Sequence, residues 1–251
     1  MRKSKMEGGP DSNQICVLDK IPIRLDADQA VMALHWNRKR DPESELQRLL
    51  DQAKTLIQPK AAYRVSSVAS VSGDEVAVGG VTFSSRVLRI NLAKVESAFP
   101  YIITIGKCLE TEAQSSGDLL KQYYLETLGD LALHLAEEYL ANTIKKEYRL
   151  RHLFSMNPGS LKNWPLTQQK MLFALFGNTE GLLGVRLTDQ MLMIPRKSIS
   201  GMYIPSAAKF SSCKLCQRKN CQGRKAPYDA RLSQTYQLKG EFDSPGGSCE
   251  F

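Results

Sequence analysis

The segment from Asp118 to Tyr148 is the longest stretch with an uninterrupted helical pattern, and it constrains the fold more than any other. Large apolar side chains recur along it at the spacing that gathers them on one face of a helix. They are Leu120, Tyr124, Leu128, Leu131, Leu135 and Tyr139, flanked by Leu125, Leu133, Leu140 and Ile144. Gly129 lies inside the pattern, where glycine weakens a helix, so we expect either a close approach of a second element or a bend. The sequence therefore predicts one long amphipathic helix.

Short β signals separated by turn residues precede this helix. Val76 and Val78 alternate with smaller or polar neighbours, Gly79-Gly80 supplies a turn that tolerates positive φ, and Val81 to Phe83 returns. Further strands are predicted at Cys16 to Leu18, Ile21 to Leu25, Val87 to Leu92 and Tyr101 to Ile105. Strands joined by tight turns favour an antiparallel sheet, and with the helices they indicate an α+β fold.

Two shorter helices complete the pattern. Asp41-Pro42 is typical of a helix start and Pro59 of a stop. The apolar stripe between them consists of Leu46, Leu49, Leu50, Ala53, Leu56 and Ile57. A second helix is predicted to begin at Pro165 and to end with Gly177 as its C-cap. Its apolar face is Met171, Leu172, Leu175 and Phe176, and the chain then returns to strand and loop as far as Pro205.

Two segments near these elements carry the most informative motif. Ser155-Met-Asn-Pro-Gly-Ser160 is a turn by composition, and Leu187 to Gly201 reads LTDQMLMIPRKSISG. From the residues alone, Ser198 to Gly201 would turn the chain, and Met191 and Met193 would be core side chains. Pro158-Gly159 would also allow the backbone to approach a flat ligand closely.

Together these segments resemble the C-terminal reactivation (AdoMet-binding) domain of cobalamin-dependent methionine synthase, and more closely its free-standing relatives. The family segment has the form L-T-E-S-x-A-M-x-P-x-x-S-V-S-G. The residues that fall on it are Leu187, Thr188, Asp189 in place of Glu, Met193, Pro195, Ser198, Ser200 and Gly201. The resemblance is clear over residues 125–205 and extends back to about residue 15.

The resemblance implies a single α+β unit whose curved antiparallel sheet is flanked by helices. In the family, AdoMet lies in a shallow groove, and the domain caps a corrinoid held by another domain. An electron and the methyl group of AdoMet then restore methylcobalamin from the inactive cob(II) state. The cofactor-binding candidates that follow are Ser155, Asn157, Pro158, Gly159, Ser160, Asp189, Met193, Ser198, Ser200 and His134.

The chain departs from the family at the turn. The family loop reads R-x-x-x-G-Y, whose arginine grips the AdoMet carboxylate and whose tyrosine lines the site, but Ser155 and Ser160 occupy these positions here. A family glutamate on the long helix falls within about a residue of His134. A serine cannot supply the bidentate, charge-assisted grip of a guanidinium. This departure weighs against AdoMet binding, whereas the predicted fold and the predicted corrinoid-facing role are less affected by it.

The C-terminal part contains a cluster of cysteines, Cys213, Cys216 and Cys221, at CxxC-x4-C spacing. In a chain without secretory features such crowding indicates metal binding more than disulfides. Three thiolates could hold a [4Fe–4S] cluster with a fourth ligand from elsewhere, or a tetrahedral zinc ion. Candidates for the fourth ligand are Cys16, Cys108, Cys249, His134 and His152. A structural metal staple without redox activity is the alternative to a redox centre.

Composition narrows the function classes. The net charge of +8 arises from basic residues spread along the 251 residues, which is typical of a solvated surface, with an acidic protein partner as the second interpretation. The sequence contains neither an apolar run long enough for a membrane span nor a nucleic-acid-binding motif, and a cytoplasmic protein is expected. P-loop, Rossmann and nucleophile-elbow motifs are also absent from it, so kinase, dehydrogenase and hydrolase functions have no support.

The sequence thus predicts a disordered N-terminus over residues 1–13, an activation-domain-like unit over 14–205, a Cys-rich metal-binding appendage over 206–239 and a disordered tail over 240–251. The expected function is that of an accessory protein which reactivates the corrinoid of a methionine synthase lacking its own activation domain, or of another corrinoid-binding protein. A flavodoxin- or ferredoxin-type protein would donate the electron. The first alternative is a non-catalytic module with structural zinc that docks to a corrinoid protein or binds the corrinoid itself. The second is an AdoMet-dependent methyltransferase of other substrates.

Overall fold

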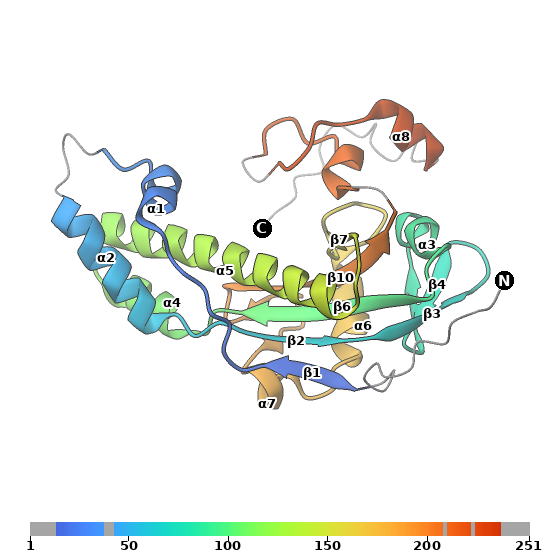
Figure 1. Cartoon of the computed structure of the whole chain (residues 1–251), viewed down its shortest axis with the longest axis horizontal. Coiled ribbons are helices and arrows are strands. Elements are labelled where there is room, and N and C mark those ends of the chain that lie inside the picture. Colours follow the sequence, from blue (N-terminus) through green and yellow to red (C-terminus); the bar gives the residue numbers. More distant parts are fainter. Residues whose placement is uncertain (1–13, 38–42, 208–209, 222–223, 237–251) are drawn as a thin grey trace.

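An antiparallel sheet with a long helix across one face organises the computed structural model, which describes residues 14–37, 43–207, 210–221 and 224–236 (Figure 1). The central strand is β6 (Ser97–Thr104), which pairs with β2 (Lys60–Arg64) on one side and with β10 (Ser198–Ser206) on the other. Strand β1 (Ile15–Leu18) pairs with β2, and β7 (His152–Met156) pairs with β10. Every pair is antiparallel, and the sheet is curled, so the predicted α+β class with a curved antiparallel sheet is confirmed.

A hairpin extends the sheet from the first residues of β6. Strand β3 (Ser66–Ser70) pairs with β6 and with β4 (Glu75–Val78), which returns as β5 (Val81–Ser84). Gly79 and Gly80 form the connecting turn with φ of +58° and +84°. Only glycine adopts such angles without strain, and the predicted hairpin is confirmed.

Helix α5 (Leu119–Glu147) is the long helix predicted from the sequence. Of its predicted apolar residues, Leu125, Leu128, Leu140 and Ile144 are buried, whereas Leu120 and Tyr139 are 57 % and 36 % exposed, because the buried face follows the side that packs on the sheet and on the other helices. It begins at its N-cap Asp118, whose carboxylate accepts the backbone N–H groups of Leu120 and Lys121. Its second half packs on the sheet, where Ala136, Leu140 and Ile144 join an apolar cluster contributed by β2, β6 and β10. This packing sets the position of the polar side chains on the same half of α5.

The first half of α5 is covered by three helices, α1 (Ala27–Leu34), α2 (Glu43–Leu56) and α4 (Cys108–Ser115), which share a second apolar cluster with it. A Cβ added at Gly129 would lie 2.9 Å from Leu109 Cδ2 of α4. Gly129 therefore serves the close approach of two helices, one of the two predicted roles. The apolar stripe of α2 is confirmed, whereas its predicted start at Asp41-Pro42 lies outside the described residues.

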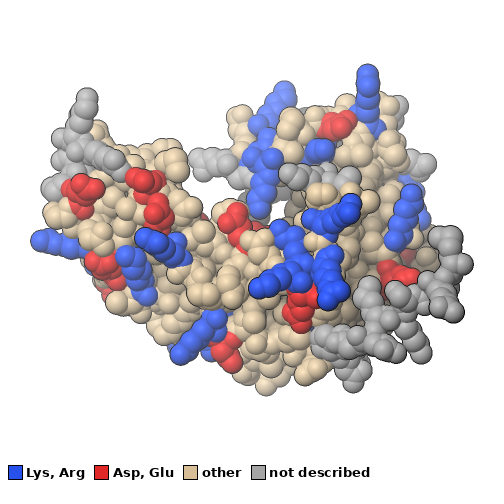
Figure 2. All heavy atoms as spheres, viewed as in Figure 1, with Lys and Arg blue, Asp and Glu red and all other residues tan. Residues whose placement is uncertain are grey.

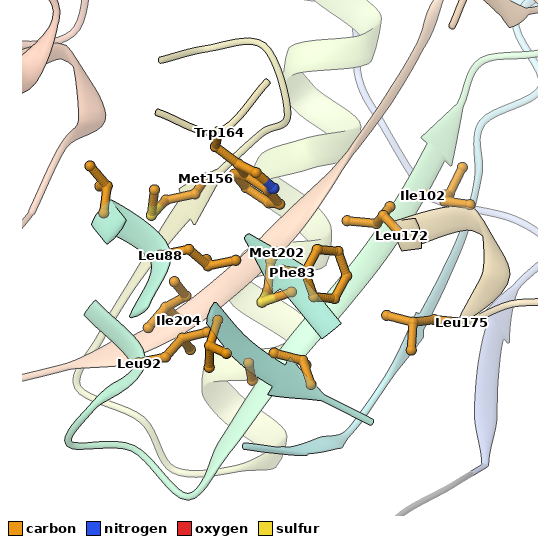
Figure 3. Close-up of a cluster of buried hydrophobic side chains, with 14 of the residues drawn as sticks. Phe83, Leu88, Leu92, Ile102, Met156, Trp164, Leu172, Leu175, Met202 and Ile204 are labelled. Atoms are coloured by element: carbon orange, nitrogen blue, oxygen red, sulfur yellow. The ribbon is translucent and has the colours of Figure 1, made fainter. Parts of the chain in front are cut away.

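The opposite face of the sheet carries the largest core, drawn in Figure 3. Helices α3 (Arg86–Leu92), α6 (Gln169–Ala174) and α7 (Thr179–Leu183) contribute to it, and the 3-10 turn Leu166–Gln168 leads into α6. Trp164 is completely buried here and packs edge-on against Phe83 of β5, with ring centroids 6.2 Å apart. Met202 and Ile204 of β10 point into the same core. Successive residues of β10 thus alternate between the two faces of the sheet.

Two predicted strands are wrong. Residues 87–92 form helix α3, because the Ser85 hydroxyl caps its start by accepting the Leu88 N–H at 3.1 Å and Val87, Leu88 and Leu92 reach the core from one side. A short apolar run cannot by itself distinguish the two structures. Residues 21–25 contain no strand. The Ile21 N–H donates to Pro59 O at 3.1 Å, but this single bond is not continued by a ladder of further backbone bonds between the two segments.

The predicted helix after Pro165 is present but shorter. It begins as the 3-10 turn and ends at Ala174, with Leu175 at the C-cap, so Gly177 at φ +66° belongs to the following turn. Met171 is 44 % exposed, and Phe173 occupies the buried face in its place. Residues 198–201 do not turn the chain but begin strand β10.

The described part of the C-terminal segment packs on the body of the protein. It contains the 3-10 turn η2 (Ser212–Leu215) and helix α8 (Ala230–Thr235). Leu215 is fully buried, and the Tyr236 hydroxyl donates to Asn91 Oδ1 of α3 at 2.9 Å. The Phe210 ring lies 4.6 Å from that of Phe154 on β7. Among the described residues, no helix is both long and apolar enough to cross a membrane.

Candidate functional site

A cleft of about 590 Å³ lies between α5, the strands β7 and β10, and the C-terminal segment. Figure 2 shows a hollow below the C-terminal segment, with Lys and Arg side chains at its edge. The lining residues are His134, Glu137, Glu138, Ala141, Leu153, Phe154, Ser155, Asn157, Ile199, Tyr203, Phe210, Ser211, Ser212, Cys213 and Lys225. The cleft therefore combines apolar walls with a small set of polar groups, as ligand sites commonly do.

Glu137 is the central polar residue of this cleft. Its side chain is only 13 % exposed, and its carboxylate accepts long hydrogen bonds of 3.4 Å from the hydroxyls of Tyr101 and Ser155. Lys225 Nζ from the C-terminal segment lies 3.6 Å from Glu137 Oε2. Because none of these contacts is short, the carboxylate retains acceptor capacity for a ligand donor.

Two stacked tyrosines hold Glu137 in place from the sheet. The rings of Tyr101 on β6 and Tyr203 on β10 lie 4.1 Å apart, and the Tyr203 hydroxyl donates to the backbone carbonyl of Glu137 at 3.0 Å. Burial, and then the negative charge of Glu137, raise the pKa of Tyr101 well above its usual value. Tyr101 therefore remains a neutral hydroxyl that can donate to the carboxylate.

Three of the predicted cofactor-binding residues line the cleft: His134, Ser155 and Asn157. Asn157 is held by two hydrogen bonds of 2.9 Å, which its Nδ2 donates to the Tyr101 hydroxyl and to the Ser200 carbonyl. The second bond joins the Pro-Gly turn of residues 155–160 directly to residues 187–201, called the closing segment below. The two segments that carry the family resemblance are thus adjacent in the structure.

The other predicted turn residues, Pro158, Gly159 and Ser160, do not line the cleft, and the last two make hydrogen bonds to nearby backbone groups. The Ser160 hydroxyl donates to Asn157 O at 2.6 Å, and the Gly159 N–H donates to Trp164 O at 2.8 Å. Pro158 is buried, and Gly159 has φ of +84°. These contacts fix the shape of the turn, and none of the three residues lines the cleft.

Ser198 and Ser200 face away from the cleft, because alternation along β10 turns Ile199 and Tyr203 toward it instead. The Ser198 hydroxyl donates to Pro195 O at 2.7 Å, and the Ser200 hydroxyl accepts from Gln169 Nε2 at 3.1 Å. Both serines are buried with protein partners. Their hydroxyls organise the closing segment on the side of the largest core.

Asp189 and Met193 also lie outside the lining of the cleft. Asp189 lies in the turn between β8 (Arg186–Leu187) and β9 (Met193–Ile194), and Met193 packs against the largest core. Ion pairs fasten the following residues to the helices: Arg196 Nε lies 2.5 Å from Glu110 of α4, and Lys197 Nζ lies 2.6 Å from Asp130 of α5. The closing segment is therefore tied to α4 and α5.

The structure does not gather the three cysteines as metal ligands. Within the described part of the chain, no group of three or more His, Cys, Asp or Glu side chains could hold a metal ion. Cys213 lines the cleft, Cys216 packs against the largest core, and Cys221 is exposed, so the three side chains have different environments. Cys213 lies within η2 and Cys216 directly after it, next to the fully buried Leu215. The predicted [4Fe–4S] or zinc centre has no support in this arrangement.

Cys213 differs from an ordinary buried thiol. Burial alone would raise its pKa, but hydrogen bonds from the Lys225 backbone N–H, the Ser211 hydroxyl and the Ala226 backbone, together with the nearby Arg224, lower it below the usual value. The Lys225 N–H lies 3.4 Å from Cys213 Sγ. The lower pKa raises the fraction of Cys213 that is thiolate at a given pH.

This shift predicts the pH dependence of alkylation at Cys213. Since the folded protein favours the thiolate, the rate of its reaction with iodoacetamide should rise at a lower pH in the native protein than in urea. Peptide mass spectrometry of metal-free protein over a pH series measures both curves at the same residue. Coincident native and denatured curves would contradict the assigned hydrogen bonds.

Sequence reasoning missed Glu137, Tyr101 and Lys225. Glu137 falls on the buried stripe of the long helix, four residues after Leu133 and three before Leu140, and a carboxylate among buried positions was the available signal. Tyr101 was interpreted only as a strand residue. Nothing in the local sequence around Lys225 indicates that it returns to α5, because that contact depends on the path of the C-terminal segment.

The curled antiparallel sheet, the long crossing helix and the cleft between them define the class of fold, and a comparison with solved structures agrees. The structure is similar to the crystal structure of the MetH reactivation domain bound to AdoHcy, with a TM-score of 0.55 and 14 % identity, over 79 % of this chain and 80 % of that one. The chain is thus a structural relative of that reactivation domain. No protein-family model and no curated protein sequence matches it.

Proposed function

We propose that this protein is an accessory factor that caps and reactivates the corrinoid cofactor of a separate methionine synthase or related corrinoid methyltransferase. The observation that carries the proposal is the cleft beside α5, with the carboxylate of Glu137 at its centre, in a fold similar to a reactivation domain bound to AdoHcy. The proposal of a role related to that of the reactivation domain is supported by the similar fold and by the chemistry of this cleft.

The polar groups of the cleft fit AdoMet in a different way from the family. AdoMet carries an ammonium and a sulfonium, which a carboxylate such as Glu137 attracts, and a carboxylate, which requires a cation. Ser155 cannot grip that carboxylate, but Lys225 reaches the cleft from the C-terminal segment. In this proposal Glu137 binds the ammonium, Lys225 binds the carboxylate, and the apolar walls exclude water. Bound AdoMet would supply the methyl group.

The partner-facing surface is proposed from the closing segment. Leu192 and Ile194 are 60 % and 38 % exposed between β8 and the start of β10, and Met191 has a φ of +65° there. Exposed apolar side chains on a segment that ion pairs fasten to α4 and α5 suit contact with a flat ring or a protein surface. The corrinoid itself would be carried by the partner, and a flavodoxin- or ferredoxin-type protein would supply the electron.

Replacing Glu137 with glutamine tests the AdoMet site. The change removes the charge and keeps the shape, so AdoMet affinity should fall by about tenfold or more, in line with the loss of one charge-assisted hydrogen bond. Isothermal titration calorimetry of the full chain with AdoMet measures the effect. Glu138→Gln is the matched control, because Glu138 lines the same cleft with a 59 % exposed side chain. Equal affinities in the three proteins would remove Glu137 from the site.

The reactivation role has its own readout. The full chain is mixed with a corrinoid-binding protein carrying cob(II)alamin, AdoMet and a chemical reductant, and the visible spectrum is followed. Methylcobalamin should accumulate only when all components are present, with one electron and one AdoMet consumed per cobalt. A change in the cob(II) spectrum without AdoMet consumption would favour the non-catalytic docking module, and no spectral change would contradict both.

A further inference from the structure

A second groove, of about 400 Å³, adjoins the cleft at the end of α5. Its lining comes from the C-terminal end of α5, the chain that follows it, β7 and the C-terminal segment, and consists of Lys145, Arg151, His152, Leu153, Phe154, Phe210, Ser211, Lys214, Lys225 and Ala226. The two hollows share Leu153, Phe154, Phe210, Ser211 and Lys225, so they are continuous.

The charge of this groove is one-sided. Four of its lining residues are lysine or arginine, from segments far apart in the sequence, and none of the described residues that line it is Asp or Glu. Lys225 is paired with Glu137 of the cleft at 3.6 Å, which leaves Lys145, Arg151 and Lys214 as the cations of this groove. Glu147, at the end of α5, accepts a hydrogen bond of 2.6 Å from Tyr63. Like charges held together repel one another unless an anion lies between them.

Backbone hydrogen bonds fix the chain on both sides of the groove. After α5 the chain reverses at Arg149, with φ of +53°, and the Leu150 N–H donates to Lys145 O at 2.9 Å. The Tyr148 N–H donates to Ile144 O at 3.0 Å. These bonds occupy backbone carbonyls at the end of α5. The carbonyls that accept them are therefore less able to neutralise the neighbouring cations. The Asp229 N–H donates to Lys214 O at 2.8 Å and fixes the opposite side.

We propose that this groove is an anion subsite that binds a phosphate group of a small molecule whose remaining part lies in the adjoining cleft. Lys145, Arg151 and Lys214 provide the charge, and Phe154 and Phe210 form the apolar junction between the two hollows. A phosphate fits better than a carboxylate, because it carries more charge at neutral pH and offers oxygen atoms to cations on several sides. The assignment does not depend on corrinoid reactivation.

Inorganic phosphate is the direct probe, and a pair of adjacent lysines provides the control. Lys145 lines the groove, whereas Lys146 is exposed and does not. Lys145→Glu and Lys146→Glu change the net charge equally, so a difference between the two variants reports on the groove. Phosphate titrated into the isotope-labelled full chain should shift the backbone resonances of residues 145, 151 and 214. We expect Lys145→Glu to weaken the affinity by about tenfold and Lys146→Glu by less than about twofold. Lys214→Gln is the second variant, should Lys145→Glu fail to fold.

Connection to the cleft is tested with adenosine 5′-monophosphate and adenosine. The nucleotide should bind more tightly than either inorganic phosphate or adenosine. In Lys145→Glu the affinity for adenosine should stay the same, and the affinity for the nucleotide should fall to that of adenosine. The proposal is overturned if phosphate shifts no resonance of the groove at millimolar concentration, or if the two lysine variants weaken binding equally. Loss of AdoMet binding in Glu137→Gln with retained phosphate binding would separate this subsite from the proposed function.

Discussion

Replacing Gly201 with alanine is expected to lower the free energy of unfolding by about 3 kcal/mol, because a small methyl group has no room at this position. A Cβ at residue 201 would lie 2.5 Å from Asn157 Nδ2, 2.6 Å from the Met156 carbonyl oxygen and 2.8 Å from the Tyr101 hydroxyl. Residue 201 lies on β10, which is paired with β6 on one side and with β7 on the other, so the strand cannot move away freely. Urea denaturation followed by circular dichroism measures the loss.

The same change should disturb the cleft, since two of the three atoms belong to residues that shape it. Asn157→Ala in the Gly201→Ala background removes the Nδ2 contact and should recover part of the stability, while the backbone carbonyl of Met156 keeps the remainder of the strain. Ala69→Val is the control, because Ala69 is exposed on β3 and can accept added bulk. A Gly201→Ala protein as stable as wild type would show that β7 and β10 separate more easily than the contacts indicate.

Replacing Trp164 with alanine is expected to cost about 4 kcal/mol, the range typical of a large aromatic removed from a core. Trp164 is fully buried in the core that joins the hairpin, α3, α6 and β10, and its edge-to-face partner Phe83 is also fully buried. The surrounding strands are held by the sheet, so the cavity would close only partly. The backbone bond between Gly159 N–H and Trp164 O would survive, because it does not involve the side chain.

Thermal or urea denaturation measures this effect, and Leu166→Ala provides the control. Leu166 lies two residues further along the chain and is 44 % exposed. Its replacement should lower the free energy of unfolding by less than about 1 kcal/mol. Trp164 faces the core on the side of the sheet away from Ile199 and Tyr203, so folded Trp164→Ala should leave the AdoMet affinity proposed for the cleft unchanged. A stability loss below 1 kcal/mol would mean that neighbouring side chains fill the cavity.

Long periodic segments were the most predictable part of this fold. The apolar stripe from Leu120 to Ile144 predicts α5 because a helix of that length needs no information from elsewhere. The hairpin at Gly79-Gly80 is equally local, since two positive φ angles define its turn. Short apolar runs were not predictable in this way: residues 87–92 could have paired as a strand, and the Ser85 cap together with a core on one side made them a helix.

The candidate site was predictable only in part. The Pro-Gly turn and the closing segment are adjacent, as the resemblance implied, yet Ser198 and Ser200 point to the opposite face from the cleft. Their orientation depends on the register of β10 against β6, and one residue of shift would have reversed it. The cysteine spacing suggested a metal site, but Cys213, Cys216 and Cys221 lie in different surroundings, and the described residues contain no group of three or more possible metal ligands.

The sequence by itself determined the long helix, the antiparallel character of the sheet and the resemblance to a reactivation domain, because these depend on periodicity and on residues close together in the chain. Only the tertiary structure decided that Glu137, Ser155 and Lys225 share one cleft and that Lys145, Arg151 and Lys214 surround the next. Both sets come from segments far apart in the sequence. They meet because Leu215 and Tyr236 bury the C-terminal segment against the core, a packing event that local sequence does not encode.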